Sequence, residues 1–150
     1  MYDCIIIGGG PAGLTAATYL GRFLRATLVI DAGAGRAASI PTTHNLIGFP
    51  EGISGEELLS RMRQHAVGYG AELVSDVAHS ITQSKTGFVV GMSSRTVEAR
   101  TVLLAPGVAN HRPNLAQAAH DRGVSRGLIR YCPICDAYEV RGKRVAVLGC

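Results

Sequence analysis

The sequence predicts an α/β fold of the Rossmann type, with three layers and a small antiparallel β-meander. One observation is the continuous apolar run at Tyr2–Ile7, which stops at a glycine loop as a buried strand of a parallel sheet does. The other is the return of this pattern near the carboxyl end, where an apolar run at 144–148 precedes Gly149. We therefore expect one Rossmann-type unit followed by the start of a second.

The composition is that of a globular protein, with 47% hydrophobic and 17% charged residues among 150. This length suits one domain with its own core and is short for two. The formal net charge of +4 is spread along the chain without a long run of like charges, which argues against nucleic acid or a membrane surface as partner. No targeting segment is apparent, and no apolar stretch approaches the roughly 20 residues that span a bilayer. A cytoplasmic protein is expected.

The first three elements follow in β-α-β order. Pro11 suits the first turn of a helix over about 12–23, which follows the strand at Tyr2–Ile7. A second buried strand at 27–30 ends in Asp31. Such a unit is parallel, with a right-handed crossover.

The segment 32–53 is a long loop without periodicity. Loops of this length inside compact domains are usually functional. Ser54 and Glu57 then form the pattern of a capping box, which predicts the start of a helix that ends near Tyr69.

The remaining chain predicts further strands separated by turns. Strands are expected at 72–82, 87–92 and 96–104. The strands on either side of a turn at 85–87 are expected to form a small antiparallel meander. The polar segment 110–127 is expected to connect to another domain. A strand at 128–131 would lead into a cysteine pair and a short helix, and a buried strand is expected at 144–148.

The glycine loop Gly8-x-Gly10-x-x-Gly13 stands between a predicted strand and a predicted helix, the context that supports a dinucleotide site. Gly8 permits the tight turn, Gly10 lets backbone approach a pyrophosphate, and Gly13 lets the helix pack on the strand. Asp31 is placed to accept hydrogen bonds from ribose hydroxyls, so FAD or NAD fits and NADP does not. The alternative is a glycine-rich turn with an exposed acid.

Cys132 and Cys135 form a Cys-x-x-Cys motif. Zinc needs about four ligands, and no second close pair of Cys or His residues exists, so we expect no metal. A purely structural disulfide is unexpected without a secretion signal. Redox use is favoured, because the start of a helix favours a thiolate. Asp136 is either the acid that protonates a leaving group or a helix-start acid, while Cys4 and Cys150 are expected to be small buried hydrophobes.

Four motifs follow one another along the chain. They are residues 2–13, His44-Asn45 before Gly48-Phe49-Pro50, Ile53-Ser54-Gly55 with Glu57-Leu58, and residues 132–136. This order resembles that of the low-molecular-weight thioredoxin reductases, within the class II pyridine nucleotide-disulfide oxidoreductase flavoproteins. The resemblance extends over essentially the whole chain.

The resemblance implies an FAD domain made of two separated stretches, with an NAD(P)H domain inserted between them. Residues 1–110 would be the first FAD stretch, and 111–150 the start of the NAD(P)H domain, which the chain would leave incomplete. It implies an enzyme in which NADPH or NADH reduces FAD, FAD reduces the Cys132–Cys135 disulfide, and this dithiol reduces a protein disulfide such as that of thioredoxin. It also implies a homodimer.

The resemblance further assigns site residues. The pyrophosphate would lie on the loop from Gly8 to Gly13, the adenine on the backbone of Ala78, and the flavin near Asn45. Cys135 would stand beside the flavin, Cys132 would exchange with the substrate, and Asp136 would be the acid. The complete set of cofactor-binding residues implied is Gly8, Gly10, Pro11, Ala12, Gly13, Asp31, Ala32, Gly35, Arg36, Asn45, Ala78, Ala105 and Gly107.

The chain departs from the family pattern at Pro106, where threonine is usual, and in the segment 33–39, which is shorter and lacks Gly-Gly-Gln. A different role near the flavin is therefore open to Arg36. Two other functions also stay open: an FAD-dependent oxidase of small-molecule dithiols, and a non-enzymatic flavin-binding redox module. Asp136 favours the reductase, because those oxidases more often have histidine at this position.

Overall fold

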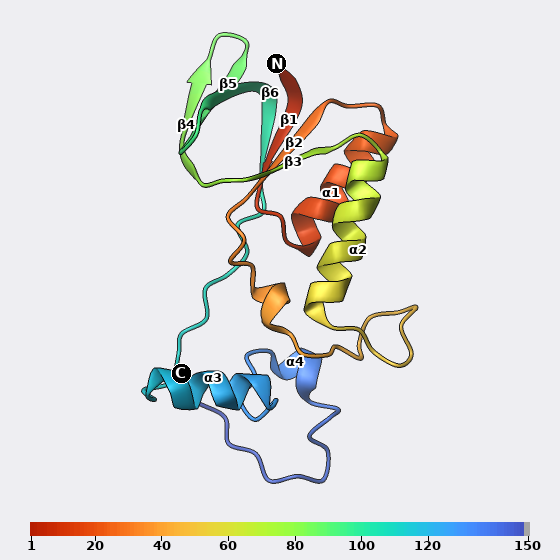
Figure 1. Cartoon of the computed structure of the whole chain (residues 1–150), viewed down its shortest axis with the longest axis vertical. Helices are drawn as coiled ribbons and strands as arrows, with labels where there is room; N and C mark the ends of the chain where they lie inside the picture. Colours follow the sequence, from red (N-terminus) through yellow and green to blue (C-terminus); the bar gives the residue numbers. More distant parts are fainter. Residues whose placement is uncertain (149–150) are drawn as a thin grey trace.

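The structure is a computed structural model that describes residues 1–148 (Figure 1). Its elements, in chain order, are β1 (Tyr2–Ile7), α1 (Pro11–Arg22), β2 (Thr27–Asp31), the 3-10 helix η1 (Arg36–Ser39), α2 (Gly55–Gly68), β3 (Glu72–Ser75), β4 (Ala78–Ser84), β5 (Gly87–Met92), β6 (Thr96–Leu104), α3 (Gln117–Ser125) and α4 (Pro133–Asp136).

One six-stranded sheet organises the larger part of the molecule, in the order β3-β2-β1-β6-β5-β4. The strands β3, β2, β1 and β6 are parallel neighbours, and β6, β5 and β4 form an antiparallel meander. On β1, Ile6 is paired with Val29 on one side and Leu103 on the other. The predicted β-α-β unit, the meander and the Rossmann-type α/β fold are confirmed.

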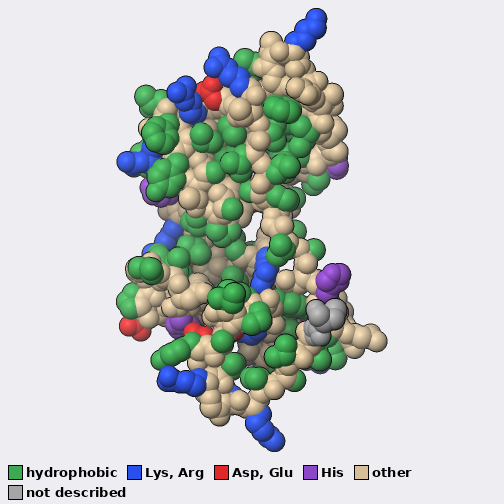
Figure 2. Space-filling view, turned by 180° about the vertical axis from the view of Figure 1, so that it is seen from behind, with side chains coloured by type: hydrophobic (Ala, Val, Ile, Leu, Met, Phe, Trp, Pro, Cys, Tyr) green, Lys and Arg blue, Asp and Glu red, His purple; other side chains and the backbone are tan. Residues whose placement is uncertain are grey.

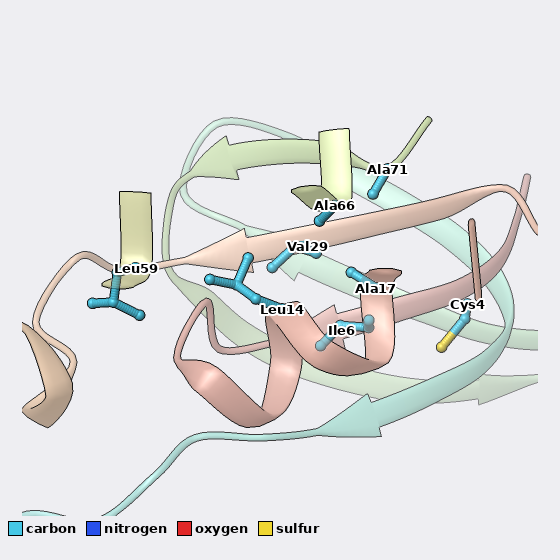
Figure 3. Packing of buried hydrophobic residues seen from close by; sticks show 8 residues of the cluster. All are labelled: Cys4, Ile6, Leu14, Ala17, Val29, Leu59, Ala66 and Ala71. Atoms are coloured by element: carbon cyan, nitrogen blue, oxygen red, sulfur yellow. The ribbon is translucent and has the colours of Figure 1, made fainter. Parts of the chain in front are cut away.

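The central parallel strands β1 and β2 are buried on both faces, which explains their continuous apolar runs. Successive residues of a strand point to opposite faces, and Ile5 and Ile6 are both fully buried. Ile6 packs with Leu14 and Val29 beneath α1 and α2, which cover one face (Figure 3). Ile5 packs on the other face with residues of the meander, among them Val90. Each such side chain contributes about 1.5–3 kcal/mol by burial. The result is three layers: helices, parallel strands and meander.

The amino terminus of α2 forms half of the predicted capping box. The Ser54 hydroxyl oxygen accepts a hydrogen bond from the Glu57 backbone N–H at 3.2 Å. The Glu57 carboxylate pairs with Arg61 one turn later, at 2.7 Å. The helix therefore begins where the sequence predicts, with a different partner for the glutamate.

The strand expected at 72–82 is divided in two. Its first half, β3, extends the parallel sheet beside β2, whereas its second half, β4, pairs antiparallel with β5. The chain changes direction at Asp76, whose carboxylate accepts hydrogen bonds from the backbone N–H groups of Val77, Ser93 and Ser94. A single strand is thus wrong, because its two halves have different neighbours.

Two segments expected to be irregular contain short helices. The loop 32–53 includes η1 and an antiparallel bridge between Thr43 and Ile53. The connection 110–127 includes α3, in which His120 and Gly123 are buried. So few buried positions leave little apolar periodicity by which the sequence could have predicted this helix.

The strands expected at 128–131 and 144–148 are not formed, so both predictions are wrong. An apolar run becomes a strand when neighbouring strands pair with it, and the described residues offer no sheet at either place. Val145, Val147 and Leu148 are 60%, 85% and 81% exposed. The second glycine loop, predicted to begin at Gly149, lies outside the described residues, as does Cys150.

Candidate functional site

A cavity of about 560 Å³ lies where the sheet and the carboxyl-terminal segment meet. The space-filling view shows a narrow, hollowed waist in the molecule (Figure 2). The sheet lobe is defined as residues 1–110, which include the six-stranded sheet, and the smaller lobe as residues 111–148, which include α3 and α4. Most of the residues singled out in the sequence line this cavity: Gly8, Gly10, Pro11, Asp31, Ala32, Gly35, Arg36, Ala78, Ala105, Gly107, Cys132, Cys135 and Asp136. Residues distant in the chain are thus brought to one place.

Three of the singled-out residues lie apart from the cavity wall. Gly13 is buried beneath the loop, and Ala12 is exposed on the first turn of α1. Asn45 is exposed, and its side-chain oxygen accepts a hydrogen bond from the Thr43 hydroxyl at 2.6 Å. In this structure Asn45 therefore does not face the cavity.

The glycines of the loop have different physical roles. Gly8 has a φ of +111°, and a Cβ there would overlap the Ala105 carbonyl oxygen. A Cβ on Gly13 would overlap the Gly8 carbonyl oxygen. A Cβ on Gly10, by contrast, would meet nothing within 4 Å. The fold itself requires Gly8 and Gly13, while Gly10 borders open space at the amino terminus of α1, where a pyrophosphate would fit.

Asp31 is held in place by the protein at the end of β2. Its carboxylate accepts hydrogen bonds from the Gly33 backbone N–H at 3.0 Å and from Arg63 on α2 at 3.1 Å. A Cβ on Gly9 would overlap this carboxylate. The carboxylate is thereby oriented while keeping free lone pairs for ribose hydroxyls. Sequence analysis missed Arg63, because a basic residue on a helix does not indicate which strand end it will face.

Cys132 and Cys135 are joined by a disulfide, with a Cα–Cα distance of 5.2 Å. Both are half-buried, whereas Ile134 between them is 92% exposed. The Cys132 sulfur caps α4 and accepts a hydrogen bond from the Cys135 backbone N–H at 3.2 Å. That hydrogen bond would also stabilise a thiolate at Cys132. Cys4 is free and buried, as the sequence predicts.

Asp136 has a basic partner that the sequence did not reveal. Its carboxylate lies 3.5 Å from the Arg130 guanidinium, and both side chains are largely buried. Arg130 also lines the cavity. Asp136, which the sequence predicts to be the acid, is therefore held by an ion pair at the cavity wall.

Tyr131, next to the cysteine pair, is bound from two sides. Its backbone carbonyl accepts a hydrogen bond from Arg36 at 2.8 Å. Its hydroxyl shares a hydrogen bond with the buried His120 ring at 2.5 Å, and the other His120 nitrogen lies 3.0 Å from Asp121. The His120 hydrogen bond holds the pKa of Asp121 below its ordinary value. None of these contacts was predicted, because they join residues without a recognisable spacing.

Residues 1–148 offer neither a metal site nor a membrane-spanning helix. No group of three or more His, Cys, Asp or Glu side chains in that range could hold a metal ion. None of the helices formed there has the length and apolar character needed to cross a membrane.

A glycine loop that fits a pyrophosphate and a reducible disulfide thus share one cavity. Comparison with known proteins agrees with this arrangement. Residues 2–150 match the family model described as pyridine nucleotide-disulphide oxidoreductase. The chain is 37% identical to the thioredoxin reductase of Bacillus subtilis, covering 99% of this chain and 46% of that protein. It is 36% identical to the bifunctional thioredoxin reductase/thioredoxin of Mycobacterium leprae, covering 99% of this chain and 32% of that protein.

Solved structures show the same similarity. The thioredoxin reductase from Streptococcus pyogenes superimposes with a TM-score of 0.82 at 31% identity, over 91% of this chain and 44% of the other. The atypical thioredoxin reductase from Desulfovibrio vulgaris gives a TM-score of 0.69 at 34% identity, over 95% and 47%. The chain thus spans less than half the length of these relatives.

Proposed function

Since the chain belongs to the pyridine nucleotide-disulphide oxidoreductase family, we propose that it acts as a thioredoxin-reductase-like disulfide reductase. The observation that carries the proposal is the single cavity with the glycine loop at one end and the Cys132–Cys135 disulfide at the other. FAD, when bound, would supply the transfer of an electron pair from a nicotinamide to this disulfide.

The residues around the cavity would bind that cofactor. Gly10 and the amino terminus of α1 would hold its pyrophosphate, and Asp31 its adenosine ribose. Ala78, Ala105 and Gly107 line the same cavity and would contact it through backbone atoms. Gly8 and Gly13 would contribute indirectly, by allowing the loop to take its shape.

The reduced cysteine pair would carry out the exchange with the substrate. The Cys132 thiolate would attack one sulfur of a protein disulfide and form a mixed disulfide, releasing the other substrate sulfur as a thiol after protonation. The Cys135 thiolate would then attack Cys132, restoring the Cys132–Cys135 disulfide and releasing the second substrate thiol. Asp136 would be the proton source at the cavity wall.

The proposal extends to organisation and location. Residues 1–110 would be the first stretch of the FAD domain, and 111–150 would begin the NAD(P)H domain, with NADPH or NADH as donor. Thioredoxin or a similar protein would be the disulfide partner, and the enzyme would be a homodimer. A cytoplasmic location would suit a dithiol that must cycle through its reduced form.

The proposal is tested by replacing one sulfur in the full-length polypeptide. Cys132→Ser should abolish reduction of thioredoxin while leaving flavin reduction by a nicotinamide intact, because the serine cannot form the mixed disulfide. Stopped-flow absorbance follows the flavin, and a thiol assay follows the substrate. Cys4→Ala, at the buried free cysteine, is the matched control and should retain both half-reactions.

Three outcomes would count against this assignment. Equal loss of both half-reactions in Cys132→Ser would show that Cys132 has no specific role in exchange with the substrate disulfide. A purified protein that has no yellow chromophore and takes up no FAD would show that the protein does not use this cofactor. Faster turnover with a small dithiol under oxygen than with a nicotinamide would favour a dithiol oxidase.

A further inference from the structure

Arg36 links the two lobes at the cavity. It begins η1, on the loop that leaves β2, whereas Tyr131 directly precedes Cys132 in the other lobe (Figure 1). The Arg36 guanidinium donates a hydrogen bond to the Tyr131 backbone carbonyl at 2.8 Å. Both residues line the cavity. One arginine of the sheet lobe is thus bound to the chain position next to the redox disulfide.

The charge of Arg36 makes this contact unusual. The side chain is half-buried, and within residues 1–148 its guanidinium lies in no ion pair. A partly desolvated cation is costly unless other groups satisfy its donors. The Tyr131 carbonyl is such a group, and a hydrogen bond from a charged donor is stronger than one between neutral groups. The electrostatics therefore favour the state in which the two lobes are in contact.

The other attachment of Tyr131 lies within its own lobe. Its hydroxyl is hydrogen-bonded to the buried His120 of α3. Tyr131 therefore moves together with α3 and the cysteine pair, whereas Arg36 moves with the sheet. Breaking the Arg36 hydrogen bond would release the disulfide segment without disturbing its own packing.

We propose that Arg36 is a positioning residue that latches the disulfide segment, residues 130–136, against the cavity through the Tyr131 carbonyl. This inference rests on the proposed function, in which the cysteine pair must meet a cofactor inside the cavity and a protein disulfide outside it. A folded protein cannot enter a cavity of about 560 Å³ to reach a half-buried disulfide. A single hydrogen bond is strong enough to favour the closed state and weak enough to open in each catalytic cycle.

The latch is tested by the reactivity of the disulfide in the full-length protein without added nicotinamide. Dithiothreitol, a neutral reductant, is applied, and free thiols are alkylated and measured at Cys132 and Cys135 by mass spectrometry. Arg36→Met should raise the rate of reduction roughly tenfold, because it removes the charged donor and keeps the side-chain length. Arg36→Lys should give an intermediate rate, because lysine keeps the charge and loses the planar fork of donors.

Arg61→Met is the matched control. Arg61 is exposed on α2, where it pairs with Glu57, and it is not among the residues that line the cavity, so its loss removes the same charge without touching the cavity wall. It should react at the wild-type rate. Wild-type rates in both Arg36 variants, or an equal increase in Arg61→Met, would overturn the latch.

A spectroscopic measurement on the flavin-loaded protein gives a second test. After reduction of the disulfide, a Cys135 thiolate beside oxidised flavin should give a long-wavelength absorption band, and Arg36→Met should weaken this band while the wild type and Arg61→Met keep it. An undiminished band in Arg36→Met would contradict the latch. The thiol assay needs no flavin, so a protein that binds no FAD would defeat the proposed function while the latch is still decided.

Discussion

At the scale of single residues, the glycine loop separates the demands of the fold from those of a ligand. A side chain at Gly13 would collide with the Gly8 carbonyl and would lie 3.1 Å from the Ile6 side chain. A side chain at Gly10 would project into open space beside α1. The sequence pattern predicts a different role for each of the three glycines, and the structure shows the contacts that constrain Gly8 and Gly13 and leave Gly10 open.

We expect Gly13→Ala to destabilise the fold and Gly10→Ala to weaken the binding of FAD. Gly13→Ala forces backbone apart in a packed core, which costs about 1–3 kcal/mol. Gly10→Ala should cost at most about 1 kcal/mol, the cost of alanine at a helix N-cap, because its methyl group meets no protein atom. Urea unfolding measures stability, and flavin fluorescence measures binding. Equal destabilisation by the two substitutions would contradict this separation.

At the scale of elements, the sequence predicts the helices and strands that are determined by residues within or next to them. The β-α-β unit and the start of α2 follow from an apolar run, a glycine loop and the Ser54 cap, all within a few residues of the element. The strands expected at 128–131 and 144–148 were wrong because an apolar run does not show whether another strand will lie beside it. The division of 72–82 at Asp76 depends on hydrogen bonds from Ser93 and Ser94, far along the chain.

Asp76 should make folding stability dependent on pH in acid. The Ser94 hydroxyl and the Val77 backbone N–H donate hydrogen bonds to its carboxylate and hold its pKa well below the ordinary value. A lowered pKa in the folded state stabilises the protein above the unfolded pKa of about 3.9, and this stabilisation is lost as the pH falls through and below that value. Asp76→Asn should therefore lower stability at pH 7 and flatten its decline between about pH 5 and pH 2.

Urea unfolding across this pH range checks the prediction. Glu51→Gln is a suitable control, because Glu51 is an exposed acid and should leave the profile close to the wild type. If Asp76→Asn and the wild type lose stability in parallel as the pH falls, the carboxylate does not connect the β3–β4 junction to the β5–β6 turn as described.

At the scale of the whole molecule, the two lobes differ in how much they bury. The sheet lobe has two apolar clusters, one on each face of its parallel strands. In the described chain after residue 110, His120 and Gly123 are the buried residues. The smaller lobe therefore depends on contacts such as the Arg36–Tyr131 hydrogen bond more than on a core of its own.

Hydrogen exchange should reflect this difference. Backbone amides of β1 and β2 should be protected by the full free energy of unfolding, whereas amides of α3 and α4 should exchange through local opening. We expect the protection in α3 and α4 to be at least about tenfold weaker, as measured by mass spectrometry of peptides from the native protein. Equal protection in the two lobes would show that they unfold as one unit.

The candidate site shows the same division between predictable and unpredictable features. The sequence indicates the glycine loop, Asp31 and the cysteine pair, because each has a characteristic spacing or follows a strand. It does not indicate Arg63, Arg130 or His120, since each meets its partner only after the chain has folded. Asn45 was singled out by resemblance alone, and the structure leaves it outside the cavity wall.

Gly9, which lies outside the recognised pattern, is also constrained, and by a side chain instead of by backbone. Gly9 lies against the Asp31 carboxylate, so any larger residue there would push the acid away from its place at the end of β2. A substitution at position 9 would therefore displace the Asp31 carboxylate and have the same effect as a substitution of Asp31 itself. The residue allowed at position 9 is thus limited by a side chain at the end of a neighbouring strand, and not by the conformation of the glycine loop.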